Sequence, residues 1–191
     1  MDLSIIIVSF NTKELLKKCL ASIKEAEVIV IDNASSDGSL EMVKKEFPKV
    51  RLIVNEKNLG FAVANNQGIM AASGEEILLL NSDTEVKAGA IEGLIKFVKE
   101  HPEAGVIGAR LLNPDGSIQP SVYHFPTILG AIKEYWLGQK VTYEKYVVTG
   151  FNPVRVEAVT GAAMLISKKT IEKIGFLDER YFMYFEDLDY C

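Results

Sequence analysis

Three small polar residues, Asn81, Ser82 and Asp83, directly follow the four aliphatic residues 77–80. Such an aliphatic run predicts a strand buried on both faces, and α/β sheets bind ligands at the carboxyl ends of these strands. A carboxylate with a flanking amide oxygen suits a hard divalent cation that bridges to phosphate oxygens. Alternatively Asp83 only caps the next helix, and these residues alone leave both interpretations open.

Two other predicted strands also end in polar residues. Ser9 ends the strand at residues 3–9 and is followed closely by Asn11, and Asp32 ends the strand at residues 28–32. The Asp32 carboxylate is able to accept a hydrogen bond from the N3–H group of a pyrimidine base. An aspartate that only satisfies the backbone amides of its own loop is an equal alternative.

Residues 58–68 combine small residues with asparagines. Gly60 stands at the expected start of a helix, where the backbone can approach a ligand closely. Asn58 precedes it, and Asn65 is expected near the same face. Tight helix packing through small residues is the alternative, which explains the alanines but not the adjacent Asn65 and Asn66.

Glu186 and Asp187 follow the aromatic run of residues 181–185. A partly desolvated aromatic wall and a neighbouring carboxylate both raise the pKa of a carboxyl group, and such a group can act as a general base towards an alcohol. Composition alone favours the alternative, which is a solvated acidic stretch.

Strand-like and helix-like patterns alternate four times along the first hundred residues, which predicts a mostly parallel sheet with helices on both faces. Asn11 and Glu14 have capping-box spacing, and Gly74 has the position of a helix C-cap. The expected strands are residues 3–9, 28–32, 51–55 and 77–80, and the expected helices are residues 12–24, 40–47, 58–72 and 91–98.

The pattern changes after residue 105. We expect a strand at residues 106–112, a turn at 113–116 and a hairpin return at 117–122, then strands at 154–159 and 163–167 and a helix at 168–174 that ends at Gly175. Residues 127–137 predict a helix with a broad apolar face. We expect that face to be core, and the alternative is a patch that rests on a membrane or a partner.

Length and composition fit one globular domain over residues 1–191, with 48% hydrophobic and 25% charged residues. The net charge of −5, without a dense basic cluster, argues against a nucleic-acid partner. The first residues lack a secretory n-region, and two cysteines cannot make a disulfide framework. We therefore expect a cytoplasmic protein.

Four motifs occur in one order at residues 30–39, 58–68, 80–83 and 184–189. Each is weak alone, but together they resemble glycosyltransferase family 2, and within it the bacterial rhamnosyltransferase-like members. The resemblance covers nearly the whole chain. It implies the GT-A fold, a Rossmann-like α/β sandwich, and metal-assisted, inverting transfer of a sugar from a nucleotide-diphosphate donor with Mg²⁺ or Mn²⁺.

The resemblance also implies roles for individual residues. Asp83 would hold the metal, whereas Asn81 stands where the family's DxD motif often has an acid. Asp187 would be the catalytic base, and Glu186 would help to position the acceptor. Gly161 and Ala162 match a small-residue turn beside the donor sugar. The donor nucleotide would be bound by Ser9, Asn11, Asp32, Asn58, Gly60, Asn65, Asn81 and Ser82.

The expected donor is dTDP-rhamnose or a UDP-sugar, and the expected acceptor is a cell-surface glycan or a lipid-linked glycan, with peripheral contact at the inner face of the membrane. Residues 1–110 would form the nucleotide-binding half. Residues 111–191 would form the acceptor-side half, which looks truncated at its C-terminus and would hold the acid pair loosely. A sugar nucleotidyltransferase and a binding module without turnover are the alternatives. A sugar nucleotidyltransferase would require a Gly-rich basic loop after the first strand, but residues 10–12 contain no glycine.

Overall fold

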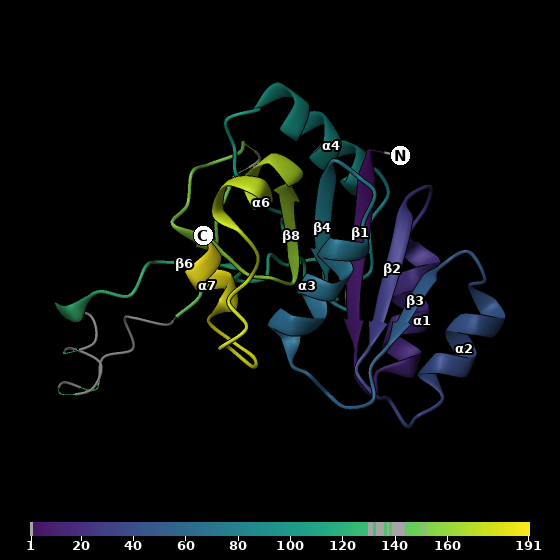
Figure 1. The fold of residues 1–191 in the computed structure, drawn as a ribbon. Helices are drawn as coiled ribbons and strands as arrows, with labels where there is room; N and C mark the ends of the chain where they lie inside the picture. The colour runs from purple at the N-terminus through teal and green to yellow at the C-terminus, as the bar shows by residue number, and fades with distance from the viewer. Residues whose placement is uncertain (1, 130–131, 133–135, 137, 139–143, 151) are drawn as a thin grey trace.

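A six-stranded sheet with strand order β3-β2-β1-β4-β8-β5 forms the centre of the molecule (Figure 1). This computed structural model describes residues 2–129, 132, 136, 138, 144–150 and 152–191. Strands β1 to β4 are parallel, and β8 runs antiparallel between β4 and β5. The predicted mostly parallel α/β sheet is therefore confirmed. The strands are β1 (Leu3–Ser9), β2 (Glu27–Asp32), β3 (Arg51–Val54), β4 (Glu76–Leu80), β5 (Val106–Gly108) and β8 (Ala163–Ser167).

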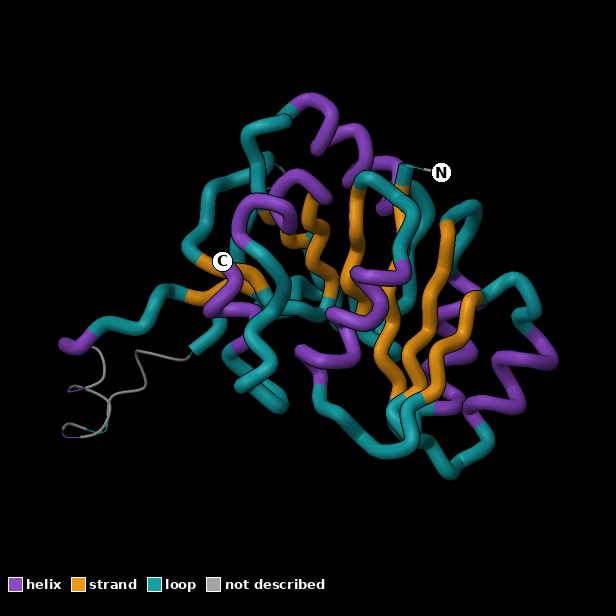
Figure 2. Tube along the Cα trace, viewed as in Figure 1, coloured by secondary structure: helices purple, strands orange, loops and turns teal. Residues whose placement is uncertain are grey.

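Helices cover both faces of this sheet (Figure 2). Alternate residues of a strand point to opposite faces, so Ile6 packs in the core under α3, whereas Ile5 and Ile7 pack in the core under α1. The first core also receives residues of α6 and α7, and the second receives residues of α2 and α4. The helices are α1 (Lys13–Ser22), α2 (Ser39–Glu46), α3 (Phe61–Ala71), α4 (Ala90–Glu100), α6 (Lys168–Ile174) and α7 (Glu186–Tyr190).

Two predicted helix caps are wrong. Asn11 has a φ of 54°, and its side-chain oxygen accepts a hydrogen bond from the Ser36 amide (2.8 Å) instead of capping α1. Helix α3 ends at Ala71 with Ala72 as its C-cap, so Gly74 is not the cap. Gly74 is small for another reason, because a Cβ atom there would lie 2.7 Å from the backbone nitrogen of Ser4.

The second half of the chain forms shorter strands than expected. The predicted strand at residues 106–112 ends at Gly108, and the predicted hairpin is reduced to one bridge between Leu112 and Ile118. Two-residue strands β6 (Val122–Tyr123) and β7 (Ala158–Val159) pair with each other outside the main sheet. The helix at residues 168–174 ends at Gly175 as predicted.

The expected core face of residues 127–137 is not buried. The exposed fractions are 83% for Ile128, 72% for Leu129, 48% for Ile132 and 85% for Trp136, whereas Tyr135 lies outside the described residues. The prediction that this face is core is therefore wrong for the residues that the structure describes. Among all the residues that the structure describes, no helix has the length and apolar character needed to cross a membrane.

Candidate active site

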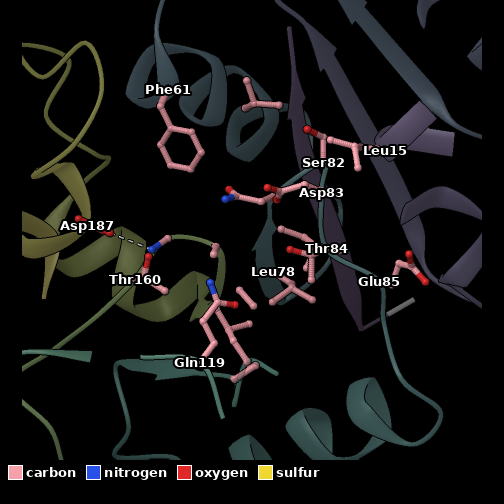
Figure 3. Close-up of a pocket in the computed structure, with 18 of the residues that line it drawn as sticks. Leu15, Phe61, Leu78, Ser82, Asp83, Thr84, Glu85, Gln119, Thr160 and Asp187 are labelled. Atoms are coloured by element: carbon pink, nitrogen blue, oxygen red, sulfur yellow. Dashed lines mark hydrogen bonds between the residues drawn. The ribbon is translucent and has the colours of Figure 1, made fainter. Parts of the chain in front are cut away.

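A cavity of about 1070 Å³ lies at the carboxyl ends of β1 and β4. Figure 3 shows Asp83 and Asp187 on facing sides of this cavity, with Phe61 between them on a third side. Nine of the predicted site residues line it: Asn58, Gly60, Asn81, Ser82, Asp83, Gly161, Ala162, Glu186 and Asp187.

The turn after β4 presents one carboxylate to the cavity. The Asn81 amide donates to the Ala162 carbonyl (3.0 Å), and the Asn81 carbonyl accepts from the Thr84 amide (3.1 Å), which fixes the turn. Thr12 Oγ1 donates to Ser82 Oγ (3.1 Å). Asp83 is exposed, and no described residue forms a hydrogen bond or ion pair with its carboxylate. The Asp83 carboxylate is therefore available to an external ligand.

The residues around Asp83 fit a metal ion that takes only part of its ligands from the protein. No group of three or more His, Cys, Asp or Glu side chains among the described residues could hold a metal. Mg²⁺ and Mn²⁺ at nucleotide sites are commonly held by one or two carboxylates together with phosphate oxygens and water. Asp83 with the Asn81 amide oxygen matches that donor set, but not a site made by protein ligands alone.

Asp32 lies at the end of β2 and is almost fully buried. Its Oδ2 atom accepts a hydrogen bond from the Ser35 amide (2.9 Å), as the loop-capping alternative proposed. Its Oδ1 atom is buried and has no hydrogen-bond partner among the described residues. Asp32 itself does not line the cavity, whereas the next residue, Asn33, does. A buried acceptor without a donor is costly, so Oδ1 is a candidate acceptor for a ligand N–H group.

Three other residues predicted to bind the donor lie outside the cavity lining. Ser9 is fully buried and hydrogen-bonds Thr12 Oγ1 (3.0 Å), and Asn11 is bound to the loop after β2. Asn65 is buried and donates to the Phe61 carbonyl within α3 (2.9 Å). Their assignment to donor binding stays a prediction.

A network of side-chain amides that sequence reasoning missed supports the loop before α3. Asn33 Nδ2 donates to Asn58 Oδ1 and to the Gly60 carbonyl (both 3.2 Å), and Asn55 Nδ2 donates to Asn33 Oδ1 (2.8 Å). Asn58 Oδ1 also accepts from the Gly60 amide (2.9 Å), which explains why α3 begins at Phe61 and not at residue 58. Three asparagines, just after β2, just after β3 and before α3, are the sequence signal, but only the fold brings them together.

Gly60 is small because another part of the protein approaches it. Its φ is +86°, and a Cβ atom there would lie 2.4 Å from the Phe182 carbonyl oxygen. That carbonyl accepts a hydrogen bond from the Phe61 amide (2.7 Å). The close approach expected at Gly60 is thus made by the segment that carries the acid pair.

The acid pair begins helix α7. Asp187 Oδ2 accepts from the Gly161 amide (3.0 Å), shown by the dashed line in Figure 3, and Oδ1 accepts from the Leu188 amide (2.9 Å). Glu186 is 5% exposed, and its Oε2 atom has no partner among the described residues. Burial, together with the charge of Asp187, raises the pKa of Glu186 to about 7. The predicted upward pKa shift is confirmed for Glu186.

The expectation that the acid pair is held loosely is wrong. Leu188 and Tyr190 are buried, and the Tyr190 hydroxyl donates to the Gly175 carbonyl (3.0 Å). Asn66 of α3 donates to the Leu177 carbonyl (2.9 Å) and accepts from the Leu177 amide (3.1 Å). These contacts anchor the segment on both sides of the acid pair.

The wall beyond Gly161 carries polar residues that the sequence did not single out. Tyr123, Lys145 and Thr160 line the cavity there together with Gln119. Lys145 Nζ donates to Thr160 Oγ1 (3.4 Å) and lies 5.2 Å from the centre of the Tyr123 ring. Residues 111–153 gave no chemical motif, because Lys145 meets Tyr123 and Thr160 only in the folded protein.

A mostly parallel sheet with a carboxylate at the end of an inner strand, and an acid pair across one cavity, is the arrangement expected of the GT-A fold. Comparison with protein families agrees, since Glycosyl transferase family 2 matches residues 4–168. The chain belongs to this family. The expected enzyme class, a glycosyltransferase of the hexosyltransferase type, is thereby confirmed.

Individual relatives support the rhamnosyltransferase-like resemblance. The chain is 29% identical to N-acetylglucosaminyl-diphospho-decaprenol L-rhamnosyltransferase of Mycobacterium tuberculosis over 98% of its own length and 68% of the relative. It is 25% identical to dTDP-rhamnosyl transferase RfbF of Shigella flexneri, over 97% of its own length and 60% of the relative.

Solved structures share the fold. Staphylococcus aureus TarS has a TM-score of 0.68 at 19% identity and covers all of this chain, which spans 32% of TarS. The mannosyltransferase PcManGT from Pyrobaculum calidifontis, in complex with GDP-Man and Mn²⁺, has a TM-score of 0.63 at 18% identity and covers 93% of this chain, which spans 48% of it. TarS 1–349 in complex with UDP-GlcNAc has a TM-score of 0.53 at 26% identity, over 63% of this chain and 38% of that one.

Proposed function

We propose that this protein transfers a sugar, rhamnose or a related hexose, from a nucleoside-diphosphate donor to a hydroxyl group of a lipid-linked or cell-surface glycan, with inversion at the anomeric carbon. One observation carries the proposal: Asp83 and Asp187 line one cavity from facing sides, and the Gly161–Ala162 turn lies against Asp187. A donor bound at Asp83 would leave its sugar at this turn, with the acceptor on the Asp187 side.

The donor nucleotide is a pyrimidine in this proposal, dTDP or UDP. The unpartnered Asp32 Oδ1 atom supports this, because it can accept from the N3–H group of either base. The names of the relatives support it as well, since RfbF is a dTDP-rhamnosyl transferase and TarS was solved with UDP-GlcNAc.

Mg²⁺ or Mn²⁺ would be held by the Asp83 carboxylate, with the Asn81 side chain beside it. When bound, the ion offsets the negative charge that develops on the diphosphate leaving group. The presence of Mn²⁺ in the PcManGT complex supports this proposal.

Asp187 is the proposed base. As the acceptor oxygen bonds to the anomeric carbon, its proton passes to the Asp187 carboxylate, and the bond from that carbon to the diphosphate oxygen breaks with its electron pair leaving on the diphosphate. This single displacement needs no covalent enzyme intermediate. Glu186, next to Asp187 and lining the same cavity, positions the acceptor.

The acceptor and the location follow from the same reasoning. The M. tuberculosis relative is named for a diphospho-decaprenol acceptor, and we propose a lipid-linked glycan here. Exposed Ile128, Leu129 and Trp136 support peripheral contact with the inner face of the membrane. Two free cysteines, Cys19 and Cys191, are compatible with a cytoplasmic location.

Two matched variants test the proposal. Asp187→Asn keeps the shape of the side chain but cannot take a proton, so we expect transfer from dTDP-rhamnose or a UDP-sugar to fall by ~10²–10⁴-fold with little change in UDP or dTDP affinity. Asp189→Asn, in the same motif but exposed and outside the cavity lining, is the control. Equal transfer rates for the wild type and Asp187→Asn would show that Asp187 is not the base. Donor binding by the wild type without sugar transfer or donor hydrolysis would favour a binding module.

A further inference from the structure

We propose that Lys145, seated over the ring of Tyr123, forms a binding site for a phosphate group of the acceptor. This inference rests on the proposed function, because it names the chemical class of acceptor that the same cavity takes. It assigns an anionic, phosphate-bearing acceptor to the wall beyond the Thr160–Gly161 turn.

The first argument is the position of the ammonium group. Lys145 Nζ donates to Thr160 Oγ1 (3.4 Å), and the amide of the next residue, Gly161, donates to Asp187 Oδ2 (3.0 Å). Adjacent residues of one turn therefore hold the cation and the proposed base. An acceptor that extends along this wall from a hydroxyl group at Asp187 would bring its neighbouring substituents close to Lys145.

The second argument concerns charge. No carboxylate in the described part of the chain forms an ion pair with Lys145, whose ammonium group contacts the Thr160 hydroxyl and the face of the Tyr123 ring. An ammonium group has three donors, and one hydroxyl group engages only one of them. The ring orients the cation without neutralising it. Lys145 is exposed at the cavity wall, where its charge is accessible to an anion, and phosphate is an anion that lysine binds as a point charge.

The third argument separates the acceptor from the donor as the source of the phosphate. The donor diphosphate is proposed to lie at Asp83, which Figure 3 shows across the cavity from Thr160 and Asp187. Another lysine, Lys87, lines the cavity and belongs to the segment after β4 that also carries Asp83. Lys145 thus stands on the side of the base, where an anionic acceptor would form an ion pair that a neutral glycan does not form. A sugar with a phosphate or diphosphate on its anomeric carbon would supply that partner one ring away from the reacting hydroxyl group.

The test compares two soluble acceptor probes by titration calorimetry, in the presence and absence of UDP. One is an N-acetylglucosaminyl diphosphate with a short alkyl chain, and the other is the neutral alkyl N-acetylglucosaminide with the same chain. We expect Lys145→Gln to weaken binding of the diphosphate probe by about tenfold and to leave the neutral probe within about twofold. Lys145→Arg should restore most of the lost affinity, and Lys168→Gln, an exposed lysine outside the cavity lining, should change neither probe.

Three results would overturn the inference. Equal loss for both probes in Lys145→Gln would mean that Lys145 only supports the wall. Unchanged binding of the diphosphate probe would mean that the cation does not meet the phosphate. A loss of UDP or dTDP affinity, with both probes unaffected, would assign Lys145 to the donor. Because these titrations need no turnover, they stand apart from the transfer assay of Asp187→Asn, whose failure would contradict the proposed reaction.

Discussion

The two carboxylate oxygens of Asp32, at the edge of the sheet, differ in their hydrogen bonding. Asp32 has one carboxylate oxygen on the Ser35 amide and one buried oxygen with no donor among the described residues. We expect UDP and dTDP to bind more tightly than GDP. Asp32→Ala removes a hydrogen-bond acceptor for the pyrimidine, so we expect it to lower the ratio of the GDP Kd to the UDP Kd by about tenfold. Calorimetric titration of the three diphosphates measures it. GDP binding as tightly as UDP to the wild type would contradict the role of Asp32.

The raised pKa of Glu186 makes stability depend on pH. The group ordinarily titrates near 4.5, whereas burial and then the Asp187 charge raise its pKa to about 7 in the folded protein. Between these values the folded state binds more protons than the unfolded state, so the free energy of unfolding falls as the pH rises through this window. We expect Glu186→Gln to remove this loss and to be more stable than the wild type at pH 8 by up to about 3 kcal/mol, with a much smaller difference at pH 4.5.

Chemical denaturation at several pH values between 4.5 and 8 tests the Glu186 prediction. Asp189→Asn, which alters an exposed carboxylate three residues later, is the control and should follow the wild type. A difference between Glu186→Gln and the wild type that stays constant with pH would show that Glu186 is ionised normally in the folded protein.

Among the secondary-structure elements, the contact between the start of α3 and the segment that carries Glu186 and Asp187 positions the acid pair. A Cβ atom at Gly60 would lie 2.4 Å from the Phe182 carbonyl oxygen, and Gly60 has a φ of +86°. We expect Gly60→Ala to lower the free energy of unfolding by about 2–3 kcal/mol and to increase proteolytic cleavage near residues 181–185.

Gly116 is a matched control for Gly60. It also has a φ of +86°, but a Cβ atom there would meet nothing within 4 Å. The decrease in the free energy of unfolding of Gly116→Ala should therefore reflect backbone strain alone. Any larger decrease in Gly60→Ala measures the steric contact with Phe182. Equal losses in the two variants would show that the contact contributes nothing.

The sequence predicted the elements of the first half well, because each strand is an apolar run that ends in polar residues. It also singled out Asp83 and Asp187, which stand out against apolar or aromatic neighbours, and both line the cavity. It missed the start of α3 and the cavity wall beyond Gly161. The start of α3 depends on Asn33 and Asn58, and the wall depends on Lys145 meeting Thr160, and these pairs are distant along the chain. Periodicity reports which face of a segment is apolar, but not which distant side chain meets it.

At the scale of the whole molecule, the exposed apolar residues after β6 are the largest departure from expectation. The predicted core face at Ile128 and Leu129 is exposed to water. Transfer of these side chains to an apolar medium would lower their free energy. We expect the wild type to bind phospholipid vesicles, and the double variant Ile128→Ser, Leu129→Ser to bind at least about tenfold more weakly.

Vesicle co-sedimentation measures this binding, with Ile174→Ser as the control because Ile174 is an exposed isoleucine of α6. The control should bind as the wild type does. Vesicle binding that is equal for the double variant and the wild type, or absent from both, would contradict membrane contact through these residues.

The interleaving of the sheet has a consequence for recombination between relatives. Strand β8, from the proposed acceptor-side half, lies between β4 and β5 of the proposed nucleotide-binding half. Helix α3 holds the segment that carries the acid pair through the Phe61 amide and the Asn66 side chain. A crossover near residue 110 would thus exchange a central strand along with the acceptor wall. Chimeras that swap acceptor preference are better built by grafting residues 111–157 alone, which leaves β8 and the partners of α3 with the sheet that they complete.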